Sequence, residues 1–94
     1  NVVNIQRENA PGDISVYPNP VKNTLNVDFE LEQDEVVVLK ITDMAGKTIF
    51  LEEYAAERGI NNYTMNFGSL ANSVYFVTMK SSNGMVTKRV VKQQ

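Results

Sequence analysis

The stretch Thr24-Leu25-Asn26-Val27-Asp28-Phe29-Glu30-Leu31 decides the fold of this chain. Apolar and polar residues alternate along it, with leucine, valine and phenylalanine at every second position. Successive side chains of a β-strand point to opposite faces, so this period of two is typical of a strand with one buried and one solvated face. The stretch therefore predicts an antiparallel sheet that packs one face on a core.

Working outward from this stretch, six more segments have the composition of short strands. They are rich in β-branched and aromatic residues and cover residues 14–17, 35–42, 47–54, 61–67, 73–80 and 85–92. Turn residues separate them, notably Asp43-Met44-Ala45-Gly46 and Ser82-Asn83-Gly84. We expect a longer connection over residues 55–59, and a helical turn only around residues 52–58. Seven short strands predict an all-β antiparallel sandwich, with a small closed barrel as the alternative.

Strand parity predicts which side chains form the core. The expected core residues are Leu25, Val27, Phe29, Leu39, Ile41, Val74 and Phe76. Val90 and Val91 are neighbours and cannot both face inward, so we expect either a β-bulge or an environment that is apolar on both faces there.

Composition excludes several classes of protein. The 94 residues make one domain, which we place at residues 14–94 behind a linker at residues 1–13. The net charge of -2 gives no case for nucleic-acid binding. No apolar run reaches the ~20 residues that a membrane helix needs. The chain begins with Asn1 and has no visible signal peptide, as expected of a C-terminal piece of a longer precursor or of a fragment prepared for expression.

The residues that carry catalysis and metal binding are mostly missing. There is no Cys and no His, so disulfides, thiolate metal sites and a histidine base are excluded. The acidic run from Asp28 to Glu35 lacks the spacing of a calcium loop and fits a solvated strand face. Glu52 and Glu53 are adjacent on a strand and point to opposite faces, so they cannot act as a catalytic pair. We expect no enzyme activity, no cofactor and no metal.

Four phrases occur in a characteristic order along the chain. They are Tyr17-Pro18-Asn19-Pro20, the hairpin from Asp43 to Lys47, the phrase from Leu70 to Tyr75, and Lys88-Arg89-Val90-Val91-Lys92 at the end. In this order they resemble the C-terminal sorting domain (type A) of type IX secretion cargo from Bacteroidetes. Ser73 stands where that family usually has glycine.

The resemblance implies an immunoglobulin-like sandwich and a sorting function. The domain would pass through the periplasm and then reach the outer-membrane surface or the medium, with the type IX machinery as partner, including outer-membrane shuttle and sortase components. A surface sortase would remove it in or before residues 1–13, and the cargo would be anchored or released. The residues implied in recognition are Tyr17, Pro18, Asn19, Pro20, Gly46, Lys88, Arg89, Val90, Val91 and Lys92.

The final hairpin is basic and has two interpretations. Lys80, Lys88, Arg89 and Lys92 could protect a sheet edge from aggregation or could form a docking surface for a secretion component. We expect the charged ends of Lys88, Arg89 and Lys92 to be solvated. The main alternative function is a fibronectin-like adhesion or spacer module, and a sugar-binding accessory module is a weaker one. A homodimer could form through an edge or a swapped strand.

Overall fold

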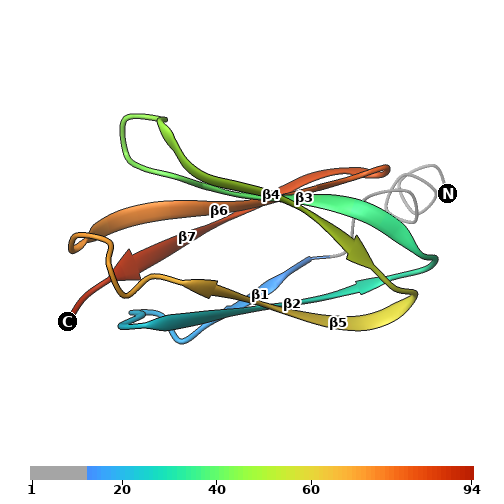
Figure 1. Ribbon diagram of the computed structural model, residues 1–94, viewed down its shortest axis with the longest axis horizontal. Coiled ribbons are helices and arrows are strands. Elements are labelled where there is room, and N and C mark those ends of the chain that lie inside the picture. Colours follow the sequence, from blue (N-terminus) through green and yellow to red (C-terminus); the bar gives the residue numbers. More distant parts are fainter. Residues whose placement is uncertain (1–12) are drawn as a thin grey trace, which may run out of the picture.

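The computed structural model describes residues 13–94, which form seven β-strands in two facing sheets (Figure 1). The strands are β1 (Ser15–Tyr17), β2 (Thr24–Leu31), β3 (Glu35–Thr42), β4 (Thr48–Ala56), β5 (Gly59–Asn66), β6 (Ser73–Ser81) and β7 (Gly84–Lys92). The predicted all-β sandwich is confirmed, and the closed barrel is not formed because the strands divide into two separate sheets.

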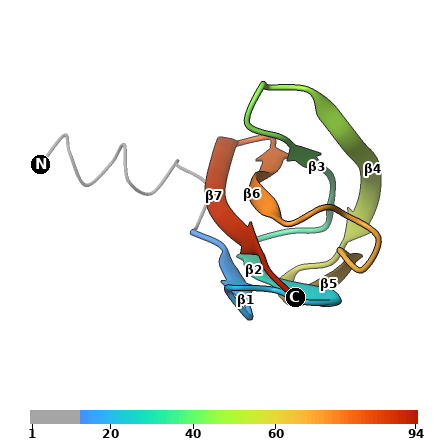
Figure 2. The same ribbon diagram turned by 90° about the vertical axis from the view of Figure 1, so that its left-hand side faces the viewer.

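One sheet has the strand order β1-β2-β5 and the other the order β4-β3-β6-β7, and all neighbours in both are antiparallel. Three connections stay within a sheet as hairpins or short links, and three cross from one sheet to the other. Figure 2, which looks along the strands, shows the two layers enclosing the core. Seven strands arranged in this way make an immunoglobulin-like sandwich.

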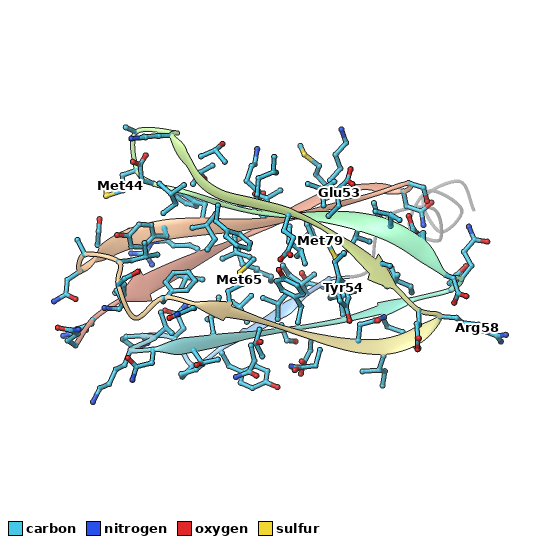
Figure 3. All side chains as sticks on the ribbon, viewed as in Figure 1. Met44, Glu53, Tyr54, Arg58, Met65 and Met79 are labelled. Atoms are coloured by element: carbon cyan, nitrogen blue, oxygen red, sulfur yellow. The ribbon has the colours of Figure 1, made fainter. Side chains whose placement is uncertain are left out.

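The core lies between the two sheets and is built from the alternate residues of each strand. Leu25, Val27 and Phe29 of β2 are buried, as the period of two predicts. Their counterparts on β3 include Leu39 and Ile41, which are also buried. Figure 3 shows Tyr54, Met65 and Met79 between the sheets, whereas Glu53 points away from the four-stranded sheet. Aromatic rings add edge-to-face contacts, such as that of Phe29 with Tyr54 at 6.5 Å between ring centres.

The prediction for β6 was wrong in its parity. Tyr75, Val77 and Met79 face the core, whereas Val74 and Phe76 are half-buried on the outer face. The first outer residues of this strand are apolar, so its two faces look alike at its start. The signal for the outer face lies further along, where Thr78 and Lys80 share the parity of Val74 and Phe76.

The link between β4 and β5 is shorter than expected. β4 continues to Ala56 and β5 begins at Gly59, so only Glu57 and Arg58 connect them, and residues 52–56 are strand rather than a helical turn. Gly59 has φ of 98°, a conformation that residues with a side chain rarely adopt. The turn is held by Asp34, whose Oδ1 accepts a hydrogen bond from the Arg58 N–H at 2.7 Å.

The final hairpin pairs in continuous register from Ser73 opposite Lys92 to Ser81 opposite Gly84. No bulge occurs at Val90 and Val91, so the second of the two expected environments is the correct one. Val90 is fully buried and Val91 is half-buried on the opposite face. The register shift in this sheet lies instead between Ile41 and Thr42, where β3 pairs with β4.

Of the predicted linker, residues 1–12 lie outside the described part of the chain, and Asp13 is the first described residue. Residues 13–94 include no helix long and apolar enough to cross a membrane.

Candidate functional site

The Tyr17–Pro20 phrase lies beside the last strand, so the fold brings together two segments that are about 70 positions apart in sequence. Proline has no N–H to donate to a ladder, so β1 ends at Tyr17, before Pro18. The chain regains strand-like bonding at Val21, which pairs in parallel with Lys92. The Val21 N–H donates to the Val91 carbonyl at 2.8 Å, and the Gln93 N–H donates to the Val21 carbonyl at 3.0 Å.

Asn19 completes this contact with its side chain. Its Nδ2 donates to the Arg89 carbonyl at 3.1 Å, and its Oδ1 accepts from the Val91 N–H at 2.9 Å. A side-chain amide has one donor group and one acceptor, as a peptide group has, so Asn19 occupies the place of a neighbouring strand. We call the segment Asn19–Val21, with these bonds, the edge clamp. It covers the open edge of β7, which would otherwise present unpaired backbone groups.

Lys92 is buried, which corrects the expectation that its charged end is solvated. Only 1% of the residue is exposed, and its Nζ donates to the Leu70 carbonyl at 3.1 Å. The physical reason is parity: Lys92 lies two residues after Val90 and shares its inward-facing side of β7. Opposite it lies Ser73, a small residue. Lys92 therefore ties the loop before β6 to the end of the chain.

Lys88 and Arg89 point to opposite sides of β7. Lys88 Nζ pairs with Asp13 Oδ2 at 3.0 Å, with both side chains partly exposed. The hydrogen bonds from Lys88 and from the Ile14 N–H lower the pKa of the Asp13 carboxyl. Arg89 is exposed on the outer face of the four-stranded sheet. Exposed ion pairs contribute little to stability, so this pair places Lys88 more than it stabilises the fold.

Tyr17 points away from the clamp, onto the outer face of the three-stranded sheet. Its hydroxyl donates to Asp28 Oδ2 at 2.8 Å, while Asn62 Nδ2 donates to Asp28 Oδ1 at 2.6 Å. These two hydrogen bonds, with that from Asn62 the stronger cause, lower the pKa of Asp28. The bond to Asp28 also raises the pKa of Tyr17. The residues Tyr17–Pro20 thus serve two places, since Tyr17 lies on the outer face of the three-stranded sheet and Asn19 lies at the edge of β7.

Gly46 lies in the hairpin between β3 and β4, at the end of the sandwich where β7 finishes (Figure 1). Its φ of 86° confirms the positive value expected from the sequence. Asp43 closes the turn, because its Oδ1 accepts from the N–H groups of Ala45 and Lys47, both at 2.9 Å. The position is built for a tight turn, and no described contact joins it to the edge clamp.

Ionisable groups offer no second site. Among residues 13–94 no three carboxylates gather in a way that could hold a metal ion. Tyr63 hydrogen-bonds Glu52, and burial together with this bond raises the pKa of Tyr63 to about 12.

The sequence did not predict the bonding role of Asn19 or the burial of Lys92. An asparagine held between two prolines was a usable signal for the first, since neither flanking residue has a backbone N–H to donate. The alternation Val90, Lys92 was a signal for the second.

Comparison with known proteins agrees with the order of the phrases. A family model described as "Secretion system C-terminal sorting domain" matches residues 15–93, a range that contains all seven strands and the edge clamp. No curated protein matches the chain.

Proposed function

The chain belongs to the family of secretion system C-terminal sorting domains, and on this premise we propose how it serves as a signal. As a type IX sorting domain it interacts with the secretion machinery and directs export to the cell surface or the extracellular space. We propose that it passes through the periplasm folded and is bound by an outer-membrane shuttle component. A surface sortase then removes it, and the cargo is anchored or released. In this proposal the domain catalyses no reaction and needs no cofactor.

The edge clamp is the observation that supports recognition of the folded domain. The bonds of Asn19 to Arg89 and Val91 exist only when the first and last parts of the domain are both in place. A receptor that reads this junction therefore distinguishes a complete sandwich from an incomplete one. The resemblance assigns recognition to the same two segments, Tyr17–Pro20 and Lys88–Lys92.

A reporter fusion tests the sorting role. A periplasmic reporter that carries residues 1–94 at its C-terminus should reach the surface or medium of a bacterium with type IX secretion. The same domain inserted between two reporter domains should stay in the periplasm. If the C-terminal fusion also stays in the periplasm, folded and intact, the sorting role is wrong and the adhesion-module interpretation is favoured.

The fate of the domain is read from the same cells. Export with loss of the domain from the reporter supports removal by a sortase, whereas an exported reporter that keeps residues 13–94 contradicts it. A cell without the sortase activity should accumulate the uncleaved fusion.

A further inference from the structure

The outer face of the four-stranded sheet exposes several large apolar side chains among its polar ones. Leu51 of β4 and Met85 of β7 are 62% and 63% exposed, and Val36 of β3 is 58% exposed. Half-buried Val38 lies between them, and half-buried Phe76 lies further along the same face. Antiparallel sheets usually present polar residues to water, so a group of large exposed apolar side chains on one face indicates an interaction site.

This face is hollowed near its centre. The hollow has a volume of about 240 Å³ and is lined by Val38, Lys40, Leu51, Thr78, Lys80 and Met85. We call it the outer hollow. Pockets for small molecules usually have volumes of ~300–1,000 Å³ and include free polar groups. Thr78 has its hydroxyl engaged with that of Thr87 at 2.9 Å. The walls of the outer hollow combine apolar side chains with Lys40 and Lys80, so they suit a large apolar side chain that is flanked by carboxylates.

The charges around the outer hollow are mainly positive. Lys40, Lys80 and Arg89 lie on this face, against one carboxylate, that of Glu53. Within residues 13–94 neither Lys40 nor Lys80 has a carboxylate at ion-pairing distance. The chain as a whole has a net charge of -2, so the basic character belongs to this face. Lys80 lies on β6, between two other strands, where a lysine has no edge to protect.

We propose that the outer face of the four-stranded sheet docks an acidic protein surface of the secretion machinery, which inserts one large apolar side chain into the outer hollow. Carboxylates of that partner would pair with Lys40 and Lys80 at the sides. This inference rests on the proposed function and gives it a place and a chemistry. It adds a docking surface to the edge clamp, and neither Lys88 nor Lys92 belongs to this surface, since the one is paired with Asp13 and the other is buried.

Two other occupants fit the charges less well. Two copies placed face to face would bring like charges together. A head-to-tail contact with the acidic outer face of the other sheet would repeat without closing and form chains. An anionic membrane surface is typically bound by clusters of 4–8 basic residues, whereas three basic residues and Glu53 lie here.

Charge-paired variants of Leu51 test the proposal in the reporter fusion. Leu51→Glu places a carboxylate against an acidic partner, so the exported fraction should fall about tenfold, because like charges across an interface are strongly unfavourable. Leu51→Lys removes the same apolar side chain but keeps the attraction to an acidic partner, so the exported fraction should fall about threefold or less. The matched control is Ile60→Glu, at an 82% exposed position on the outer face of the other sheet, which should export normally.

Lysine variants give an independent measurement. Lys40→Gln with Lys80→Gln should reduce export several-fold, and Lys22→Gln with Lys47→Gln, at exposed positions elsewhere, should not. A photo-crosslinking amino acid in place of Met85 leaves the charge of the face unchanged. It therefore tests the docking face even where a charge variant does not fold. It should give one protein adduct in secreting cells, and the same amino acid at Ile60 should give none.

The outcomes separate the two proposals. Retention of the wild-type fusion in the periplasm overturns the sorting role itself. Export of the wild type together with normal export of folded Leu51→Glu overturns only the docking face. Equal losses for Leu51→Glu and Leu51→Lys overturn the acidic partner. A Met85 adduct with the mass of two copies overturns the acidic partner in favour of a second copy of the chain. Binding of the purified domain to anionic vesicles, if Lys40→Gln with Lys80→Gln abolishes it, overturns the acidic partner in favour of a membrane.

Discussion

Asn19 uses its side-chain amide where a neighbouring strand would use a peptide group. The bonds to the Arg89 carbonyl and the Val91 N–H are a donor and an acceptor on one planar group, spaced as the edge of β7 requires. Val21 then continues the ladder with its own backbone. The two prolines on either side of Asn19 cannot donate, so the side chain supplies what the backbone lacks.

Replacing this amide should loosen the end of the sandwich. Asn19→Ala should lower the free energy of unfolding by about 1 kcal/mol, since two partly exposed hydrogen bonds are lost. The measurement is denaturant unfolding of the purified domain. Asn72→Ala is the control, at an exposed loop position without a described side-chain hydrogen bond. Equal effects of the two substitutions would show that the edge clamp does not hold β7.

Lys92 shows how a charged residue can be part of a core. Its Nζ reaches the Leu70 carbonyl, and among the described residues it has no carboxylate partner. Lys92→Glu should cost about 3–5 kcal/mol, because it buries an unpaired carboxylate beside a carbonyl oxygen. Lys92→Met should stay within about 1 kcal/mol of the wild type, since it keeps the length and removes the buried charge.

The comparison for Lys92 is Lys22→Glu, at an exposed position, which should change stability by no more than about 0.5 kcal/mol. Chemical unfolding of the three variants measures the difference. A small cost for Lys92→Glu would mean that the end of β7 opens readily to water.

At the scale of strands, alternation predicted some elements and failed on others for a physical reason. β2 has one polar face, so the sequence predicts which of its residues are buried. β6 lies in the middle of its sheet and begins with apolar residues on both faces, so Val74 and Phe76 look as buried as Tyr75 and Val77 do, and only Thr78 and Lys80 mark the outer face. The ends of β4 and β5 were missed because a two-residue link with Gly59 replaces the longer loop that residues 55–59 suggested.

A matched pair of phenylalanines tests the assignment of faces. Phe29 is 3% exposed and contacts Tyr54, whereas Phe76 is half-buried on the outer face. Phe29→Ala should therefore cost about 3–5 kcal/mol, as a buried phenylalanine does. Phe76→Ala should cost about 1 kcal/mol, because only part of its ring leaves an apolar environment. Urea unfolding of both variants gives the comparison, and equal costs would mean that the outer face of β6 is as buried as the inner face of β2.

At the scale of the whole molecule, the sandwich holds together through packing between its two sheets. The chain has no Cys and no His, and among residues 13–94 no three carboxylates gather in a way that could hold a metal ion. The fold class and the sorting family follow from local strand signals and from the order of the phrases. The outer hollow and the edge clamp could not be predicted in the same way, because each depends on the register between strands that are distant in sequence.

A chelator should therefore leave the domain unchanged. We expect the same melting temperature with and without EDTA, measured by circular dichroism on the purified 94-residue chain. A fall in the melting temperature that calcium or zinc reverses would contradict a metal-free fold.

Carboxylates that are hydrogen-bonded in the folded state should make the stability of the molecule fall in acid. Asp28 joins β1, β2 and β5 through its bonds with Tyr17 and Asn62, and these bonds lower its pKa below the ordinary value of 3.8. A group whose pKa is lower in the folded state adds stability above its unfolded pKa. That stability is lost as the pH falls through the folded value. The melting temperature should thus drop as the pH is lowered below about 4.

Asp28→Asn separates this contribution from general acid unfolding. The variant should lose less melting temperature than the wild type between pH 7 and pH 3, because an amide does not titrate. Glu30→Gln is the control on the same exposed face, without a described hydrogen bond, and it should keep the wild-type drop. If the melting temperature of Asp28→Asn falls as far as that of the wild type, the acid-sensitive contact lies elsewhere. The Asp13–Lys88 pair at β7 is then the next group to test. The stability that this pair adds is also lost in acid, since Lys88 lowers the pKa of Asp13.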